Sequence, residues 1–138
     1  MGIMDFLNIF LIVMEYVIID YLEKLEGNGM EDLLNQFPQK IPLEHSSEYA
    51  FSRDDALLFL DLLYRKRKYI ILGGDVLDEN LNYTYDNWFY SPQDSQNHIE
   101  ESYKMAQEYV ATFKNFSANL CYFVFTIDKA EVYLPLKL

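Results

Sequence analysis

The chain has 138 residues, of which 51% are hydrophobic and 17% aromatic, and its formal net charge is −11. This content excludes an intrinsically disordered chain and predicts one globular domain over residues 1–138, with a core that needs neither disulfides nor a metal. The charge argues against nucleic-acid and membrane partners, because phosphates and anionic lipids repel an acidic surface. The lone cysteine, Cys121, lies in an apolar run, which predicts a buried thiol in a reducing compartment.

Residues 3–19 are mostly apolar and recur at helical spacing. Asp5, Asn8 and Glu15 interrupt this run, whereas a transmembrane helix needs about 20 apolar residues with few charges. The acidic start also differs from the basic start of a signal peptide. The pattern favours a helix covered on more than one side in a cytoplasmic protein, and it leaves open a strand over residues 9–14.

A second helix is predicted to begin at Ser52. Ser52 and Asp55 resemble a capping box, and the acids of this first turn suit the positive end of the helix dipole. Its apolar stripe is expected to contain Ala56, Phe59, Leu60 and Leu63. The basic run over residues 65–68 falls in the last turn, where cations are favourable.

The remaining elements follow from proline positions and from runs of β-forming residues. Pro38 ends a short helix over residues 30–37, and Pro42 makes residues 39–48 a poor candidate for regular structure. The other expected elements are a strand over 69–76, a turn over 78–82, a short strand over 83–85, a helix from Asp94 or Ser95 to about Phe113, a turn over 115–119, a strand over 120–127 and a last strand over 131–134. The strand over 120–127 is predicted to be central and covered on both faces. The whole predicts an α+β domain with a small, mainly antiparallel sheet packed by three or four helices.

The sequence carries no motif of a known catalytic or phosphate-binding site. The two histidines, His45 and His98, lack a metal-ligand spacing and are expected to face solvent. No EF-hand loop is present either, so we expect no metal, no cofactor and no enzyme activity. One enzymatic alternative remains, a small hydrolase or transferase that uses Asp75 and Asp86 as acid and base in a shared cleft.

The most informative stretch is acidic and aromatic. Residues 69–103 contain seven acids, several tyrosines, the single tryptophan of the chain, and no Lys or Arg. Carboxylates and aromatic anchors together suit the recognition of a basic protein partner, although a solvated acidic face over an aromatic core would give the same pattern. The candidate binding residues are Asp75, Asp78, Glu79, Asn82, Tyr83, Tyr85, Asp86 and Trp88. Gly73 and Gly74 interrupt the strand before them, which is typical of a β-bulge or a close backbone approach.

The segments ILGGDV at 71–76 and TYDNWFY at 84–90, together with the helix start at 52–56, resemble the bacterial immunity proteins of polymorphic toxin systems. More narrowly, they resemble a small group marked by GGDV and YDNW. The resemblance covers roughly residues 50–127. It implies a non-enzymatic cytoplasmic protein that protects its producer by binding a cognate toxin. The family motif residues Gly73, Gly74, Asp75 and Trp88 then belong either to the contact or to the scaffold, in which case Asp78, Glu79, Asn82 and their neighbours recognise the toxin. A general interaction adaptor is the other non-enzymatic alternative.

Overall fold

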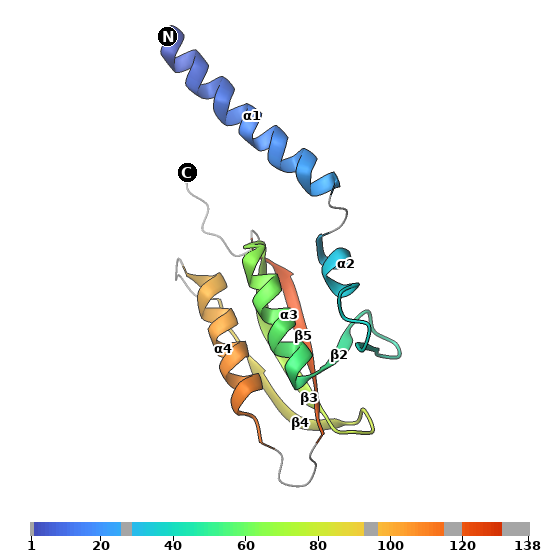
Figure 1. Ribbon diagram of the computed structural model, residues 1–138. Coiled ribbons are helices and arrows are strands. Elements are labelled where there is room, and N and C mark those ends of the chain that lie inside the picture. The colour runs from blue at the N-terminus through green and yellow to red at the C-terminus, as the bar shows by residue number, and fades with distance from the viewer. Residues whose placement is uncertain (1, 26–28, 93–96, 115–119, 131–138) are drawn as a thin grey trace. The chain divides into compact units, whose positions relative to one another are not determined.

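The computed structural model describes residues 2–25, 29–92, 97–114 and 120–130. The chain divides into two compact units, Met1–Gln36 and Phe37–Leu138. Across the described residues there are four helices and a five-stranded antiparallel sheet, which confirms the predicted α+β class (Figure 1).

The first unit contains α1 (Ile3–Leu25) and α2 (Gly29–Leu34). Because α1 runs unbroken from Ile3, the alternative of a strand over residues 9–14 is wrong. The large apolar side chains of α1 are exposed from Ile3 to Ile18, so the residues of this unit do not provide the expected cover on more than one side. The short helix before Pro38 is confirmed, but it ends earlier than predicted.

The second unit is built on a sheet with the strand order β1-β2-β5-β3-β4, and every neighbouring pair is antiparallel. The strands are β1 (Ile41–Pro42), β2 (Tyr49–Ser52), β3 (Tyr69–Leu77), β4 (Tyr83–Phe89) and β5 (Tyr122–Lys129). The prediction that β5 is central is confirmed. The sequence reading missed β1 and β2, and it ended the strand at residues 83–85 too early. The last strand expected, over 131–134, lies outside the described residues.

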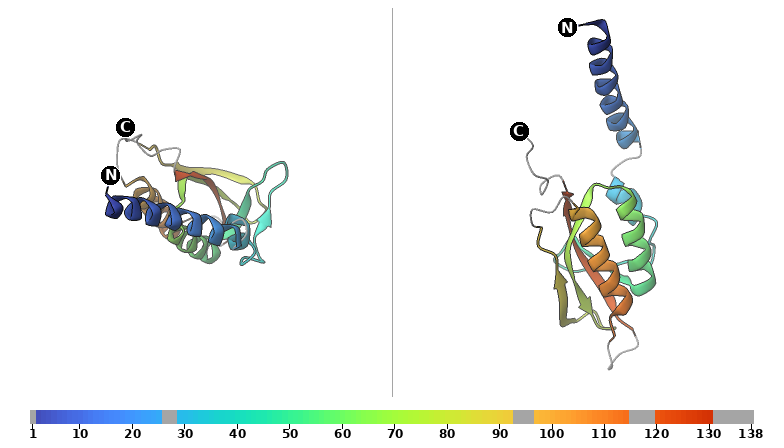
Figure 2. Two further views of the ribbon diagram at one scale, coloured as in Figure 1. Left: turned by 90° about the horizontal axis from the view of Figure 1, so that it is seen from above. Right: turned by 90° about the vertical axis from the view of Figure 1, so that its left-hand side faces the viewer.

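Helices α3 (Arg53–Arg65) and α4 (His98–Thr112) cover one face of this sheet (Figures 1 and 2). The Oγ of Ser52 accepts a hydrogen bond from the Asp55 N–H at 3.4 Å, as the capping pattern predicts. All four residues of the predicted α3 stripe are buried. Tyr103, Ala106 and Val110 of α4 are buried as well. The expected caps Asp94 and Ser95 and the turn over 115–119 lie outside the described residues.

The layer between helices and sheet is a continuous series of aromatic rings. Phe51 of β2 stacks on Phe59 of α3 with 4.6 Å between ring centroids, and Phe59 stacks in turn on Phe125 of β5 at 5.9 Å. Trp88 of β4 meets Phe125 edge-on at 5.9 Å and stacks on Tyr109 of α4 at 4.5 Å. Rings from α3, α4 and three strands therefore form one core, in which each ring fixes the position of the next.

The opposite face of the sheet is called the open face below. A small apolar cluster of Ala50, Leu77 and Val124 lies there, with Ile41 and Leu43 packed against it. Farther along β5, Thr126 is exposed. The prediction that β5 is covered on both faces therefore holds for its first half only.

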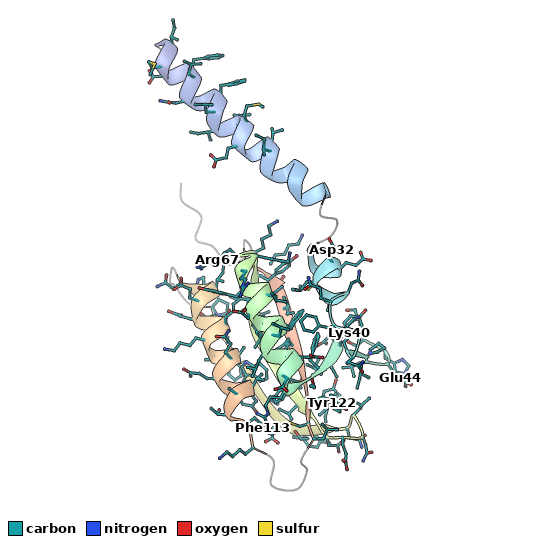
Figure 3. The ribbon with its side chains drawn as sticks, in the orientation of Figure 1. Asp32, Lys40, Glu44, Arg67, Phe113 and Tyr122 are labelled. Carbon is teal, nitrogen blue, oxygen red and sulfur yellow. The ribbon has the colours of Figure 1, made fainter. Side chains whose placement is uncertain are left out.

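Arg53 joins the two helices. Its guanidinium donates to the backbone oxygen of Val110 and, at 2.7 Å, to that of Phe113. Phe113 lies directly after α4 and is labelled in Figure 3. It also lies over the ring of Phe123, 5.5 Å from the centroid. The carbonyls at the C-terminus of a helix lack partners within the helix, and Arg53 satisfies two of them with charged donors.

Candidate functional site

The absence of a side chain at Gly74 leaves space for the Trp88 ring in the core. Gly74 stands opposite Trp88 on one side and Phe125 on the other, so the three residues form one row across the sheet. A Cβ at Gly74 would collide with the Trp88 ring and with the Val124 backbone oxygen. Trp88 is only 8% exposed as a result. This predicted binding residue thus lies beneath the surface, on the helix side.

Gly73 has a different constraint, in its backbone. Its φ of +155° is a conformation that glycine adopts far more readily than other residues, and a Cβ there would collide with the Trp88 backbone oxygen. The pairing of β3 with β5 shifts register between Ile71 and Gly73. The pair therefore marks a bulge and a close backbone approach together, as the sequence pattern indicates.

Asp78 organises the loop that joins β3 to β4. Its Oδ1 accepts hydrogen bonds from the N–H groups of Asn80 and Asn82, both at 2.9 Å. Its own N–H donates to the Asn82 backbone oxygen at 2.9 Å. One carboxylate oxygen of Asp78 is thus occupied by the turn, while the neighbouring Glu79 is exposed.

Three aromatic side chains of β4 are exposed: Tyr83 at 56%, Tyr85 at 91% and Phe89 at 77%. Tyr83 pairs with Leu77 and Phe89 pairs with Gly73, which places both rings on the open face. Phe89 was not among the predicted binding residues. The alternation of side chains along a strand signals its exposure once Trp88 is assigned to the core.

Tyr85 lies where the pairing of β3 with β4 shifts register, between Asp75 and Leu77. Its φ is +68°, a left-handed conformation that is costly for an aromatic residue. In the same bulge, the Thr84 hydroxyl donates to the Val76 backbone oxygen at 3.0 Å and accepts from the Asp86 N–H at 3.2 Å. Side-chain hydrogen bonds therefore replace part of the strand ladder and hold Tyr85 outward.

The two carboxylates of the enzymatic alternative lie on different faces. Asp75 pairs with Asn87 and is half-buried on the open face. Asp86 precedes Asn87, so strand alternation assigns it to the face of Trp88. Burial raises the pKa of Tyr109, and the negative charges of Asp86 and then Asp75 raise it further. Asp86 raises the pKa of Tyr109 more than Asp75 does, which agrees with the position of Asp86 on the Tyr109 side. Because Asp75 and Asp86 lie on opposite faces of the sheet, a shared acid–base cleft is disfavoured.

The cysteine and the two histidines show no arrangement that suggests catalysis or metal binding. Cys121 is buried as predicted, and burial raises the pKa of its thiol although the nearby Arg53 lowers it in part. His45 is exposed as predicted, but the prediction for His98 is wrong, because it is buried with Nδ1 3.3 Å from the Tyr90 hydroxyl. Within the described ranges, no His, Cys, Asp and Glu side chains gather in a group able to hold a metal ion.

Among the residues that the structure describes, no helix combines the length and apolar character that crossing a membrane requires.

Comparison with known protein families identifies the family of this chain. The family model described as Immunity protein 40 matches residues 34–127, more than half of the chain. The matched range contains all five strands apart from the end of β5, together with α3 and α4, and α1 lies before it. No curated protein and no solved structure matches the chain. The chain therefore belongs to the Immunity protein 40 family.

Proposed function

We propose that this protein neutralises a cognate bacterial toxin by stoichiometric, non-covalent binding through the hairpin of β3 and β4. The proposed contact, called the hairpin surface below, comprises Asp75, Glu79, Asn82, Tyr83, Tyr85, Asp86 and Phe89. The observation that carries the proposal is the row of exposed aromatic rings on β4, on a hairpin that also carries the carboxylates of Asp75, Glu79 and Asp86. Asp78 shapes the loop of this surface, and Trp88 supports it from the core.

The exposed rings are the suggested anchors. Phe51, Phe123 and Phe125 of β2 and β5 are buried, whereas Tyr85 and Phe89 expose most of their rings. Rigid aromatic side chains gain apolar contact at low cost in conformational entropy, which explains their frequency among the residues that dominate protein interfaces. The left-handed backbone at Tyr85 is also typical of strain retained at a functional site.

The carboxylates suggest the character of the partner. Asp75 lies on the open face, Glu79 lies in the loop between β3 and β4, and Asp86 is exposed on the other face of β4. Residues 69–103 contain no Lys or Arg. Such a surface attracts a cationic toxin, accelerates the encounter and accepts hydrogen bonds from Arg and Lys. Occupation of the toxin surface is sufficient for inhibition, so we propose no catalytic step, and we propose that the complex forms in the cytoplasm.

The direct test mixes the purified protein with the toxin domain encoded beside its gene. Toxin activity should fall linearly and vanish near a 1:1 ratio. The double variant Glu79→Gln/Asp86→Asn should associate more slowly and depend less on salt, because it lacks two of the steering charges. Glu108→Gln changes an exposed acid on α4 and serves as the matched control.

Two results would remove the proposal. Undiminished toxin activity at a large excess of the protein would exclude neutralisation and leave the adaptor alternative. Equal association rates for the double variant and its α4 control would exclude the electrostatic role of the hairpin surface.

A further inference from the structure

We infer that the toxin contributes an extended, cationic segment that adds a strand to the free edge of β4, next to residues 86–89. This inference rests on the proposed function and specifies how the hairpin surface is engaged. It starts from the strand order, in which β4 is the last strand and pairs only with β3 among the described residues (Figure 1).

The hydrogen bonds of β4 indicate which backbone groups face outward. The Tyr90 N–H donates to the Leu72 backbone oxygen at 2.7 Å, directly after β4. In an antiparallel pair, backbone groups point alternately toward and away from the neighbouring strand. Trp88 therefore shares the inward orientation of Tyr90, and the N–H and C=O groups of Asn87 and Phe89 point away from β3.

The opposite edge of the sheet is a poor template by comparison. There, β1 has only two residues, and one of them is Pro42, which has no N–H to donate. In contrast, β4 has seven residues and no proline. The bulge at Tyr85 interrupts its ladder, so a regular partner strand fits beyond it, along residues 86–89, a length of about 13 Å.

The charge on this strand distinguishes between possible occupants. In an antiparallel pair of two β4 strands, the symmetry would bring Asp86 and the acids of one hairpin close to those of the other. Like charges across strands are destabilising, and each chain carries a net charge of −11. A segment with Lys or Arg would instead meet the carboxylates while its backbone pairs with Asn87 and Phe89. The exposed Tyr85 and Phe89 rings would contact its side chains.

The test separates the backbone from the side chain at one position. Asn87→Ala and Asn87→Pro both remove the amide side chain, but only the proline variant also removes the outward N–H. Proline is tolerated on an edge strand where its missing N–H faces solvent, so both variants should fold. We expect Asn87→Pro to bind the toxin encoded beside the gene roughly tenfold more weakly than Asn87→Ala, through loss of an intermolecular hydrogen bond.

Hydrogen exchange of the unsubstituted protein gives a second readout, which does not depend on the folding of the proline variant. The Asn87 and Phe89 amides should exchange quickly in the free protein and become protected in the complex, whereas the Trp88 amide should be protected in both. Unchanged exchange at Asn87 and Phe89 on toxin binding would overturn the inference.

The remaining outcomes separate this inference from the proposed function. Equal toxin affinity of the two Asn87 variants, with weaker binding by Glu79→Gln/Asp86→Asn, would exclude strand addition and retain the hairpin surface. Dimerisation of the free protein that Asn87→Pro abolishes would assign the edge to a second copy and contradict the toxin segment. Absence of any toxin binding would contradict both proposals.

Discussion

The two faces of the sheet differ most clearly at neighbouring residues of β4. Trp88 is 8% exposed and stacks on Tyr109, whereas the next residue, Phe89, is 77% exposed on the open face. On the helix side, every large ring of the series has an aromatic neighbour. On the open face, Tyr83 and Phe89 are exposed, and Asp75 lies on the same face. One short strand therefore builds the scaffold with alternate residues and presents the proposed contact with the others.

This difference shows that aromatic content alone does not identify a binding surface. Trp88 is the single tryptophan and the most obvious anchor in the sequence, yet Gly74 gives its ring space in the core. Substitutions in the core on the helix side should consequently reduce stability, and substitutions of the exposed rings of β4 should reduce toxin binding with little loss of stability. The following variants test that division.

The largest loss of stability is expected from Gly74→Ala. The new Cβ would collide with the Trp88 ring and the Val124 backbone oxygen, and a strand backbone in the centre of a sheet has little room to move. We expect the free energy of unfolding to fall by about 3 kcal/mol, measured by urea denaturation. Gly2→Ala is the control, because its Cβ would meet only the Asp5 carboxylate at 3.9 Å. Equal stability of the two variants would contradict the close packing of Trp88.

The next largest loss of stability is expected from removing the hydrogen bonds by which Arg53 links α3 to α4. Arg53→Met keeps the aliphatic chain but removes the donors to the Val110 and Phe113 carbonyls. We expect a loss of about 2 kcal/mol in the free energy of unfolding. Arg65→Met, which breaks an exposed ion pair with Asp61, should cost less than about 0.5 kcal/mol. A similar cost for both would show that Arg53 is not a structural link.

A smaller effect, with the opposite sign, is expected at Tyr85. Asn tolerates the left-handed conformation better than Tyr, so Tyr85→Asn should raise the free energy of unfolding by up to about 1 kcal/mol. The same variant should weaken toxin binding, because it removes the most exposed ring. Tyr83→Asn is the matched control, since Tyr83 lies outside the positive-φ residues and should gain no stability. Loss of stability in Tyr85→Asn would contradict strain at this position.

The last effect is confined to alkaline pH and concerns the helix side. Burial, the hydrogen bond donated to Glu101 and the charge of that carboxylate raise the pKa of Tyr90 to about 12. The native state therefore retains a proton that the unfolded chain loses near pH 10. This contribution to stability is complete below pH 10 and is lost as pH rises toward 12. Between pH 10 and pH 12, the free energy of unfolding should fall less steeply in Tyr90→Phe than in the unsubstituted protein. An equally steep fall in both would contradict the raised pKa of Tyr90.

Local patterns in the sequence predicted the helices well. The Ser52 cap and the spacing from Ala56 to Leu63 are set within one segment, and both are confirmed. The continuous apolar run of β5 likewise predicted a central strand, because a strand buried by neighbours needs few polar residues. The glycine pair predicted a bulge from backbone chemistry alone.

Features that depend on distant residues were not predicted. Strand β2 has only four residues and runs directly into the α3 cap, and its pairing with β5 becomes visible only in the fold. Arg53 bonds to residues 57 and 60 positions away, which no local pattern reveals. The sequence also gave Trp88 and Tyr85 equal standing as binding candidates. Their burial and exposure follow from the register between β3 and β4, which depends on a bulge.

The most direct measurement compares toxin affinity between variants of the two surfaces. The triple variant Tyr83→Ala/Tyr85→Ala/Phe89→Ala removes the exposed rings of β4, and Leu58→Ala/Met105→Ala removes exposed apolar side chains from α3 and α4. We expect the dissociation constant for the cognate toxin to rise by at least about 100-fold in the first and to change less than about twofold in the second. Unchanged affinity of a folded triple variant, or loss of binding in the helix variant alone, would contradict the assignment of toxin recognition to the hairpin surface.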